Sequence, residues 1–135
     1  MTISVFAKLH AVAVVTFLVI DLMWLGFVAR TFYQAQLGHL MRPNVTWVAA
    51  IVFYLMFVVG IVMLVVWPAV ERHSLNHALF FGALFGLVTY AAYDLTNLAT
   101  LAGFPLQVAV VGLIWGTVLC ATVSVVTYLA SQRLM

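Results

Sequence analysis

The chain has 135 residues, of which 67% are hydrophobic and 6% charged, and its formal net charge is +2. A water-soluble domain carries about 25% charged residues, so this composition excludes a soluble globular protein and predicts a chain surrounded by the lipid bilayer. The small positive balance comes without a basic cluster, so no nucleic acid partner is expected.

Four apolar runs predict four transmembrane helices at about 4–28, 47–67, 75–99 and 105–130. Each run is long enough to cross a hydrocarbon core of about 30 Å at about 1.5 Å per residue. The predicted fold class is therefore an all-α membrane protein, a four-transmembrane-helix bundle of two helical hairpins. It forms a single integral membrane domain over residues 1–135, with no room for a soluble catalytic domain.

The connector 30–46 is the most polar part of the chain. Its residues 32–41 predict a short interfacial helix, which Pro43 would end. The residues expected to face the lipid headgroups are Phe32, Tyr33, Leu37, Leu40 and Met41. A short turn is predicted to begin at Pro68, and Ser74 is the predicted N-cap of the third span.

Small residues recur every fourth position in the third and fourth spans. The third span has Ala78, Gly82 and Gly86, and Tyr90 and Asp94 continue the same ridge. The ridge of the fourth span consists of Gly112, Gly116, Cys120 and Ser124. Small residues let two backbones approach closely in lipid, where helices have little hydrophobic reason to associate. Both ridges are therefore predicted packing surfaces.

The basic residues predict an orientation. Lys8, Arg72 and Arg133 would share one side of the membrane, and Arg30 and Arg42 the other. Because cytoplasmic loops carry an excess of Lys and Arg, three against two favours both termini in the cytoplasm. The difference is small, and dual topology stays open.

Two of the three acidic residues lie inside spans. Asp21 and Asp94 each begin an Asp-Leu-x-x-Leu stretch, and both are expected in the outer half of the bilayer. A charged carboxylate at membrane depth costs at least about 2.5 to 3.5 kcal/mol, so each should face the bundle interior or water. Asp94 is expected to face the bundle interior within reach of Tyr90, Asn97 or a polar group from another span. It is expected to matter more than Asp21, because its own helix supplies two polar neighbours on the same face.

If the two helix faces meet, the bundle holds a polar set in its outer half. The predicted set is Asp21, Trp24, Tyr54, Tyr90, Asp94, Asn97 and Trp115. Three interpretations stay open for it. The aspartates could fix helix packing through hydrogen bonds alone, they could hold a ligand, proton or ion, or they could take part in catalysis.

The histidines raise a separate hypothesis. His10 and His77 would lie early in the first and third spans, and two histidines on facing helices could ligate a haem. Interfacial histidines are commoner, so no haem is predicted and the cofactor stays unknown. Cys120 is the single cysteine, and no His-Glu-x-x-His pattern occurs. No metal site is therefore predicted.

Several motifs carry a resemblance to a known family. They are Asp21-Leu22-Met23-Trp24-Leu25-Gly26, Phe32-Tyr33 with Leu37-Gly38, Phe53-Tyr54, Tyr93-Asp94-Leu95-Thr96-Asn97-Leu98-Ala99-Thr100-Leu101 and Trp115-Gly116-Thr117-Val118-Leu119. With these motifs the chain resembles, over nearly its whole length, the bacterial four-helix membrane family known as domain-of-unknown-function family 2177. The resemblance implies four spans and a bacterial inner membrane, and it implies no activity.

The chain also departs from that family's pattern at two places. Gly112 stands where the family tends to have an acidic residue, one turn before the tryptophan. The turn 102–105 reads Ala-Gly-Phe-Pro, where the family tends to have Arg-Gly-Trp-Pro. The role of the family's full polar set could therefore be reduced or altered in this chain.

The function predicted is that of a polytopic inner-membrane protein with a polar pocket in its outer half, for small-molecule binding or transport. One alternative is an accessory subunit of a larger membrane complex, whose polar face pairs with a partner helix. Another is an intramembrane enzyme acting on lipid or an isoprenoid. The expected partner is the lipid bilayer, and a homo-oligomer or a larger complex stays open.

Overall fold

The computed structural model describes residues 1–135, apart from the side chain of Val28. Four of its helices are long and apolar enough to cross a membrane, namely Ile3–Phe27, Trp47–Glu71, Leu75–Thr100 and Leu106–Leu134. Among the described residues no strand occurs. The structure confirms the predicted fold class, an all-α membrane bundle of four long helices.

Two π-helical segments, η1 and η2, interrupt the α-helical geometry. The first follows α1, and the second joins α3 to α4. In chain order the elements are α1 (Ile3–Met23), η1 (Trp24–Val28), α2 (Arg30–Leu37), α3 (Trp47–Ile61), η2 (Val62–Val66), α4 (Trp67–Glu71), α5 (Leu75–Thr100) and α6 (Leu106–Leu134). The predicted cap of the third span is confirmed, because Ser74 Oγ accepts a hydrogen bond of 3.1 Å from the backbone N–H of His77.

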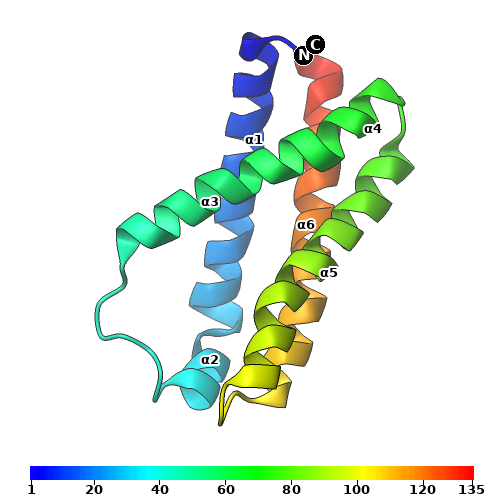
Figure 1. Cartoon of the computed structure of the whole chain (residues 1–135). Helices are drawn as coiled ribbons and strands as arrows, with labels where there is room; N and C mark the ends of the chain where they lie inside the picture. The colour runs from blue at the N-terminus through cyan, green and yellow to red at the C-terminus, as the bar shows by residue number, and fades with distance from the viewer.

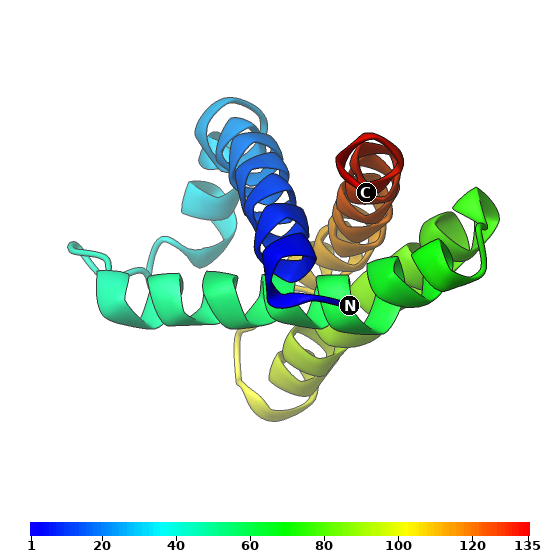
Figure 2. The same ribbon diagram turned by 90° about the horizontal axis from the view of Figure 1, so that it is seen from above.

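The bundle has two distinct ends (Figure 1). Both chain termini and the turn between α4 and α5 lie at one end, called here the terminal end. The connector 30–46 and the turn between α5 and α6 lie at the other, called the connector end. Helices α1, α5 and α6 run between the two ends, while the continuous helix of α3, η2 and α4 crosses them obliquely (Figure 2).

Both ridges of small residues are packing surfaces, as predicted, and the structure shows that they pack against each other. A Cβ added to Gly86 would lie 2.0 Å from the carbonyl oxygen of Gly116, and one added to Gly82 would lie 2.7 Å from Ser124 Oγ. Real Cβ atoms essentially never come this close to another heavy atom, so glycine is required for this approach. Helices α5 and α6 therefore form a close hairpin along most of their length.

The main apolar core lies nearer the terminal end. Its fully buried large side chains include Leu9, Phe17, Val58, Ile61, Val66, Leu119 and Val123. These residues belong to α1, α3, η2 and α6. Toward the connector end α3 diverges from α1 (Figure 1), and a cavity lined by residues of both helices lies at that end.

Pro68 lies within a helix, so the predicted turn at this residue is wrong. The helix continues through η2 and α4 to Glu71. Proline lacks an N–H and its ring crowds the preceding turn of an α-helix. Here the preceding turn is the wider π type, in which the N–H of Trp67 bonds the carbonyl of Val62, and a π turn of this kind accommodates the proline without ending the helix.

The connector helix is shorter than predicted and faces a different neighbour. Helix α2 ends at Leu37, before Gly38, and not at Met41. The apolar cluster at this end consists of Phe104, Val108 and Ala109, with Phe32, Tyr33, Leu37 and Leu98 packed against it. Three of the residues expected to face lipid headgroups thus bury apolar surface against the start of α6, while Leu40 and Met41 stay exposed.

Candidate functional site

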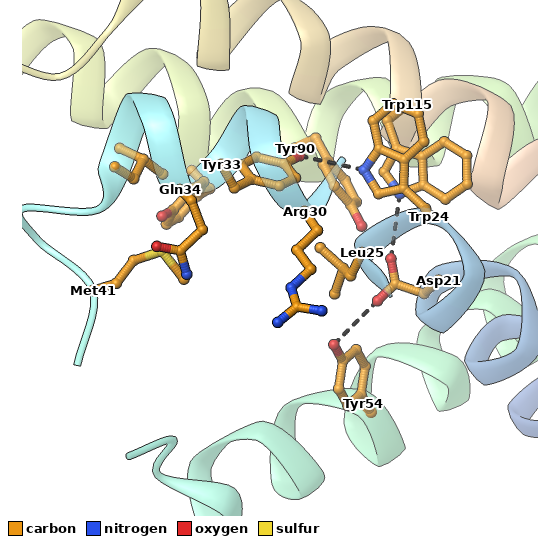
Figure 3. Close-up of a pocket in the computed structure, with 12 residues that line it drawn as sticks. Asp21, Trp24, Leu25, Arg30, Tyr33, Gln34, Met41, Tyr54, Tyr90 and Trp115 are labelled. Carbon is orange, nitrogen blue, oxygen red and sulfur yellow. Dashed lines mark hydrogen bonds between the residues drawn. The ribbon is translucent and has the colours of Figure 1, made fainter. Parts of the chain in front are cut away.

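A cavity of about 530 Å³ lies at the connector end of the bundle (Figure 3). It is lined by Asp21, Trp24, Leu25, Arg30, Tyr33, Gln34, Leu37, Met41, Tyr54, Tyr90, Tyr93 and Trp115. All four long helices and α2 contribute to this lining. Six of the side chains are aromatic, one is acidic and one is basic, so the cavity combines rings with a single charge of each sign.

Asp21 is the acidic residue of the cavity, and it is only 6% exposed. Its Oδ2 accepts a hydrogen bond of 3.1 Å from the Tyr54 hydroxyl. Its Oδ1 accepts one of 3.3 Å from Trp115 Nε1. One carboxyl group therefore joins α1, α3 and α6, and both of these donors are neutral groups that orient it without balancing a charge.

Two tryptophans form the wall beside Asp21. The rings of Trp24 and Trp115 stack with centroids 4.3 Å apart and an interplanar angle of 9°. Trp24 Nε1 also donates a hydrogen bond of 3.4 Å to the Tyr33 hydroxyl. Burial raises the pKa of that phenol above its ordinary value, so Tyr33 stays neutral. This contact attaches α2 to the first span.

The local sequence explains why these side chains meet. Trp24 follows Asp21 by three residues, which places both on one helix face, and η1 begins at Trp24. On the opposite wall Tyr90 packs its ring against α6, where a Cβ on Gly116 would lie 2.2 Å from Tyr90 Cγ. The glycine thus lets a large ring lie on the helix backbone and reach the cavity.

The connector supplies the part of the cavity that the sequence analysis missed. Arg30, Tyr33, Gln34, Leu37 and Met41 all line it. The first four recur at helical spacing from Arg30, and this was the signal that one face of the connector helix turns inward. In Figure 3 the Arg30 side chain lies between Gln34 and the pair formed by Asp21 and Tyr54.

Five of the seven predicted polar residues line this cavity, and two do not. Tyr90 lines it, but Asp94, one turn further along α5, faces α6 instead and is 2% exposed. A Cβ added to Gly112 would lie 2.1 Å from Asp94 Oδ2, so the carboxyl group occupies the space that a side chain at position 112 would take. Asn97 is half-buried and also lies outside the lining.

Asp94 faces the bundle interior, as expected. Its Oδ2 has no hydrogen-bond partner among the described residues, so neither Tyr90, nor Asn97, nor a polar group of another span bonds this atom. The hydrogen bonds that join the side chains of different spans belong to Asp21. The expected order of the two aspartates is therefore reversed in the contacts they make. Asp94 packs between two helices, while Asp21 is held at the wall of a cavity.

The histidines lie away from this cavity. His10 Nε2 is 3.3 Å from the carbonyl oxygen of Leu55, and the ring of His77 stacks on Phe81 with centroids 4.2 Å apart. His10 therefore meets α3, while His77 meets its own helix. Within the described part of the chain, no group of three or more His, Cys, Asp or Glu side chains could hold a metal ion.

The fold and the cavity define a polytopic membrane protein with a polar, aromatic site between its spans. The chain belongs to the family described as Predicted membrane protein (DUF2177), whose family model matches residues 6–129. That description gives a membrane location and no activity. Comparisons with curated proteins and with solved structures find no match.

The contact between Asp94 and Gly112 gives a testable prediction about packing. Gly112→Ala should lower the free energy of unfolding by about 1–3 kcal/mol, the usual cost of overpacking, because the new Cβ meets the carboxyl group. Asp94→Ala in the same chain should restore most of the loss, since it removes the opposing atoms. Reversible unfolding by sodium dodecyl sulfate, followed by circular dichroism, measures both changes.

Gly26→Ala is the matched control, because nothing lies within 4 Å of a Cβ at Gly26. It should leave the stability within about 0.5 kcal/mol of the parent. A double variant as unstable as Gly112→Ala alone would show that the Asp94 carboxyl group is not what fills this space.

Proposed function

We propose that the protein binds a small organic molecule with a positively charged nitrogen, and that Asp21 is the counter-ion. The supporting observation is the state of the Asp21 carboxyl group, which is buried in the cavity wall and held by two neutral donors, Tyr54 and Trp115. An ionised carboxylate at membrane depth is costly unless it pairs with a positive group. A cation in the cavity lowers that cost and gains affinity from it.

The aromatic lining supports the same class of ligand. Cations bind over the faces of tryptophan and tyrosine rings, by about 2 kcal/mol or more when water is excluded. Six such rings line the cavity. Its volume of about 530 Å³ falls within the usual range for small-molecule sites, which is about 300–1,000 Å³. The ring faces and the Asp21 carboxylate together suit an ammonium group, and the lining also contains the cationic Arg30.

Transport is the extension of this function that the membrane setting suggests, because the site lies between spans and near one end of the bundle. The accessory-subunit alternative makes a different prediction, since a partner helix would then copurify and cover the cavity. An enzyme acting on lipid or an isoprenoid would need Asp21 to meet a reacting bond. Binding is the step that transporter and enzyme share, so it is tested first.

We further infer that the chain is one integral domain in a bacterial inner membrane, with both termini in the cytoplasm. Lys8, Arg72 and Arg133 belong to the terminal end, and Arg30 and Arg42 to the connector end. An excess of basic residues favours the cytoplasmic side. In this orientation the cavity opens toward the periplasmic half of the bilayer.

The binding proposal predicts that the site prefers a positively charged ligand to a neutral ligand of the same shape. Radiolabelled choline should bind the protein purified in a neutral maltoside detergent. The neutral isostere 3,3-dimethylbutan-1-ol should displace it at least about tenfold less well than unlabelled choline, because only the ammonium group gains from Asp21 and the rings. A scintillation proximity assay measures both affinities.

Asp21→Asn should reduce choline binding to the level of the isostere, since the amide keeps the shape but not the charge. Asp94→Asn is the matched control and should bind choline like the parent, because Asp94 lies outside the cavity. The proposal fails if choline does not bind the parent, or if Asp21→Asn binds it equally well.

The orientation is tested by single cysteines in a Cys120→Ala background. His39→Cys, in the connector, should react in whole cells with a membrane-impermeant thiol reagent. Glu71→Cys and Gln132→Cys should react only after the membrane is opened, because all three positions are exposed but lie at opposite ends of the bundle. Equal labelling of the three in whole cells would indicate dual topology.

A further inference from the structure

A second, apolar hollow adjoins the cavity. It has a volume of about 460 Å³ and is lined by Phe53, Phe57, Thr89, Tyr90, Ala92 and Tyr93. We call it the α3–α5 groove after the two helices that form it. Tyr90 and Tyr93 line both the groove and the cavity, so these two side chains form a wall that the two spaces share. A ligand long enough to pass them would occupy both.

The groove lies on the part of the bundle that faces lipid. The first half of α3 diverges from the other helices there (Figures 1 and 2), and most of its side chains are exposed, among them Val48 at 76% and Trp47 at 64%. These residues belong to a predicted membrane span. A hydrocarbon chain can therefore enter the groove sideways from the bilayer, without passing through water.

The cavity itself carries one charge of each sign. Asp21 lies on its inner wall and Arg30 projects into it from the start of α2 (Figure 3). A simple cation uses only the first of these groups. The guanidinium of an arginine binds phosphate through paired, charge-assisted hydrogen bonds. The two side chains together match a headgroup that holds an ammonium and a phosphate.

The two groups lie at different depths, so a headgroup that meets both must turn its ammonium inward, from a phosphate at Arg30 toward Asp21. Asp21 lies six residues before Phe27, the end of the first span, or about 9 Å along the helix. Arg30 lies beyond the end of that span, where phosphates of the bilayer surface are found. The site therefore reaches from the headgroup layer to just inside the hydrocarbon.

We propose that the natural ligand is an amphiphile with an ammonium–phosphate headgroup in the cavity and a hydrocarbon chain in the α3–α5 groove. The proposal rests on the proposed function, because it adds a phosphate and a chain to the cation that Asp21 binds. The headgroup chemistry is shared by free phosphocholine and by a membrane phospholipid. The groove favours the lipid, since a free headgroup leaves it unused.

Displacement of radiolabelled choline by two probes distinguishes these sources. Phosphocholine should displace it at least about threefold better than choline does, and Arg30→Gln should remove that gain. Lysophosphatidylcholine, with one acyl chain, should displace it at least about tenfold better than phosphocholine, because the chain fills the groove. Lysophosphatidylglycerol of the same chain length lacks the ammonium and should bind more weakly than lysophosphatidylcholine.

Ala92→Trp tests the groove without changing the cavity, since Ala92 lines only the groove. It should keep the affinity for phosphocholine and lose the gain from the acyl chain. Val110→Trp, on the exposed surface of α6 and outside both linings, should behave like the parent.

Two results would overturn the lipid proposal. One is lysophosphatidylcholine binding no better than phosphocholine, and the other is Ala92→Trp binding the lysolipid as the parent does. Choline binding that depends on Asp21 would survive either result, so the failure of the lipid proposal is separate from the failure of the proposed function.

Discussion

A carboxyl group inside a bilayer has no water to bond, and this constraint organises the connector end of the protein. The Asp21 carboxyl group satisfies this constraint by accepting hydrogen bonds from two other spans, one from the Tyr54 hydroxyl and one from the Trp115 indole. Those bonds hold three helices around one point although the helices are not closely packed there. The stack of Trp24 on Trp115 then extends the same arrangement to α2 through Tyr33.

Over the described residues, the hairpin of α5 and α6 is held by close backbone packing and not by hydrogen bonds between side chains. Its glycines bring two backbones so close together that a Cβ atom has no room at Gly82 or Gly86. Tyr90 and Asp94 continue the ridge into the wider part of the interface, where each lies against a glycine of α6, Gly116 and Gly112 respectively. Tyr90 is large enough to pass its glycine and reach the cavity. Asp94 is too short, and it stays between the helices.

The sequence predicted well what depends on pattern alone. Composition and run length gave four spans, and the fourfold spacing of small residues gave the surface between α5 and α6. Depth along each span also brought Asp21, Tyr54 and Trp115 together, because side chains at one level of a bundle are neighbours. These inferences need only helical geometry and the cost of polar groups in lipid.

What the sequence could not predict depends on helix rotation and on chain path. Both aspartates have the right depth, but only the rotation of α5 against Gly112 decides that Asp94 misses the cavity. The helical spacing from Arg30 indicates that one face of the connector helix is shared, but it does not give the path by which the connector brings that face to the cavity. The π turn before Pro68 was missed because propensity counts proline as a helix breaker.

The most direct test of the central claim is a solid-state NMR measurement of the contact between ligand and carboxyl group. The protein, labelled with carbon-13 at the aspartate side-chain carboxyls, is reconstituted in lipid with nitrogen-15 choline, and dipolar recoupling reports which carbon lies near the nitrogen. The account predicts one such contact, which disappears in Asp21→Asn and persists in Asp94→Asn. A contact that persists in Asp21→Asn, or bound choline with no contact to any aspartate, would contradict it.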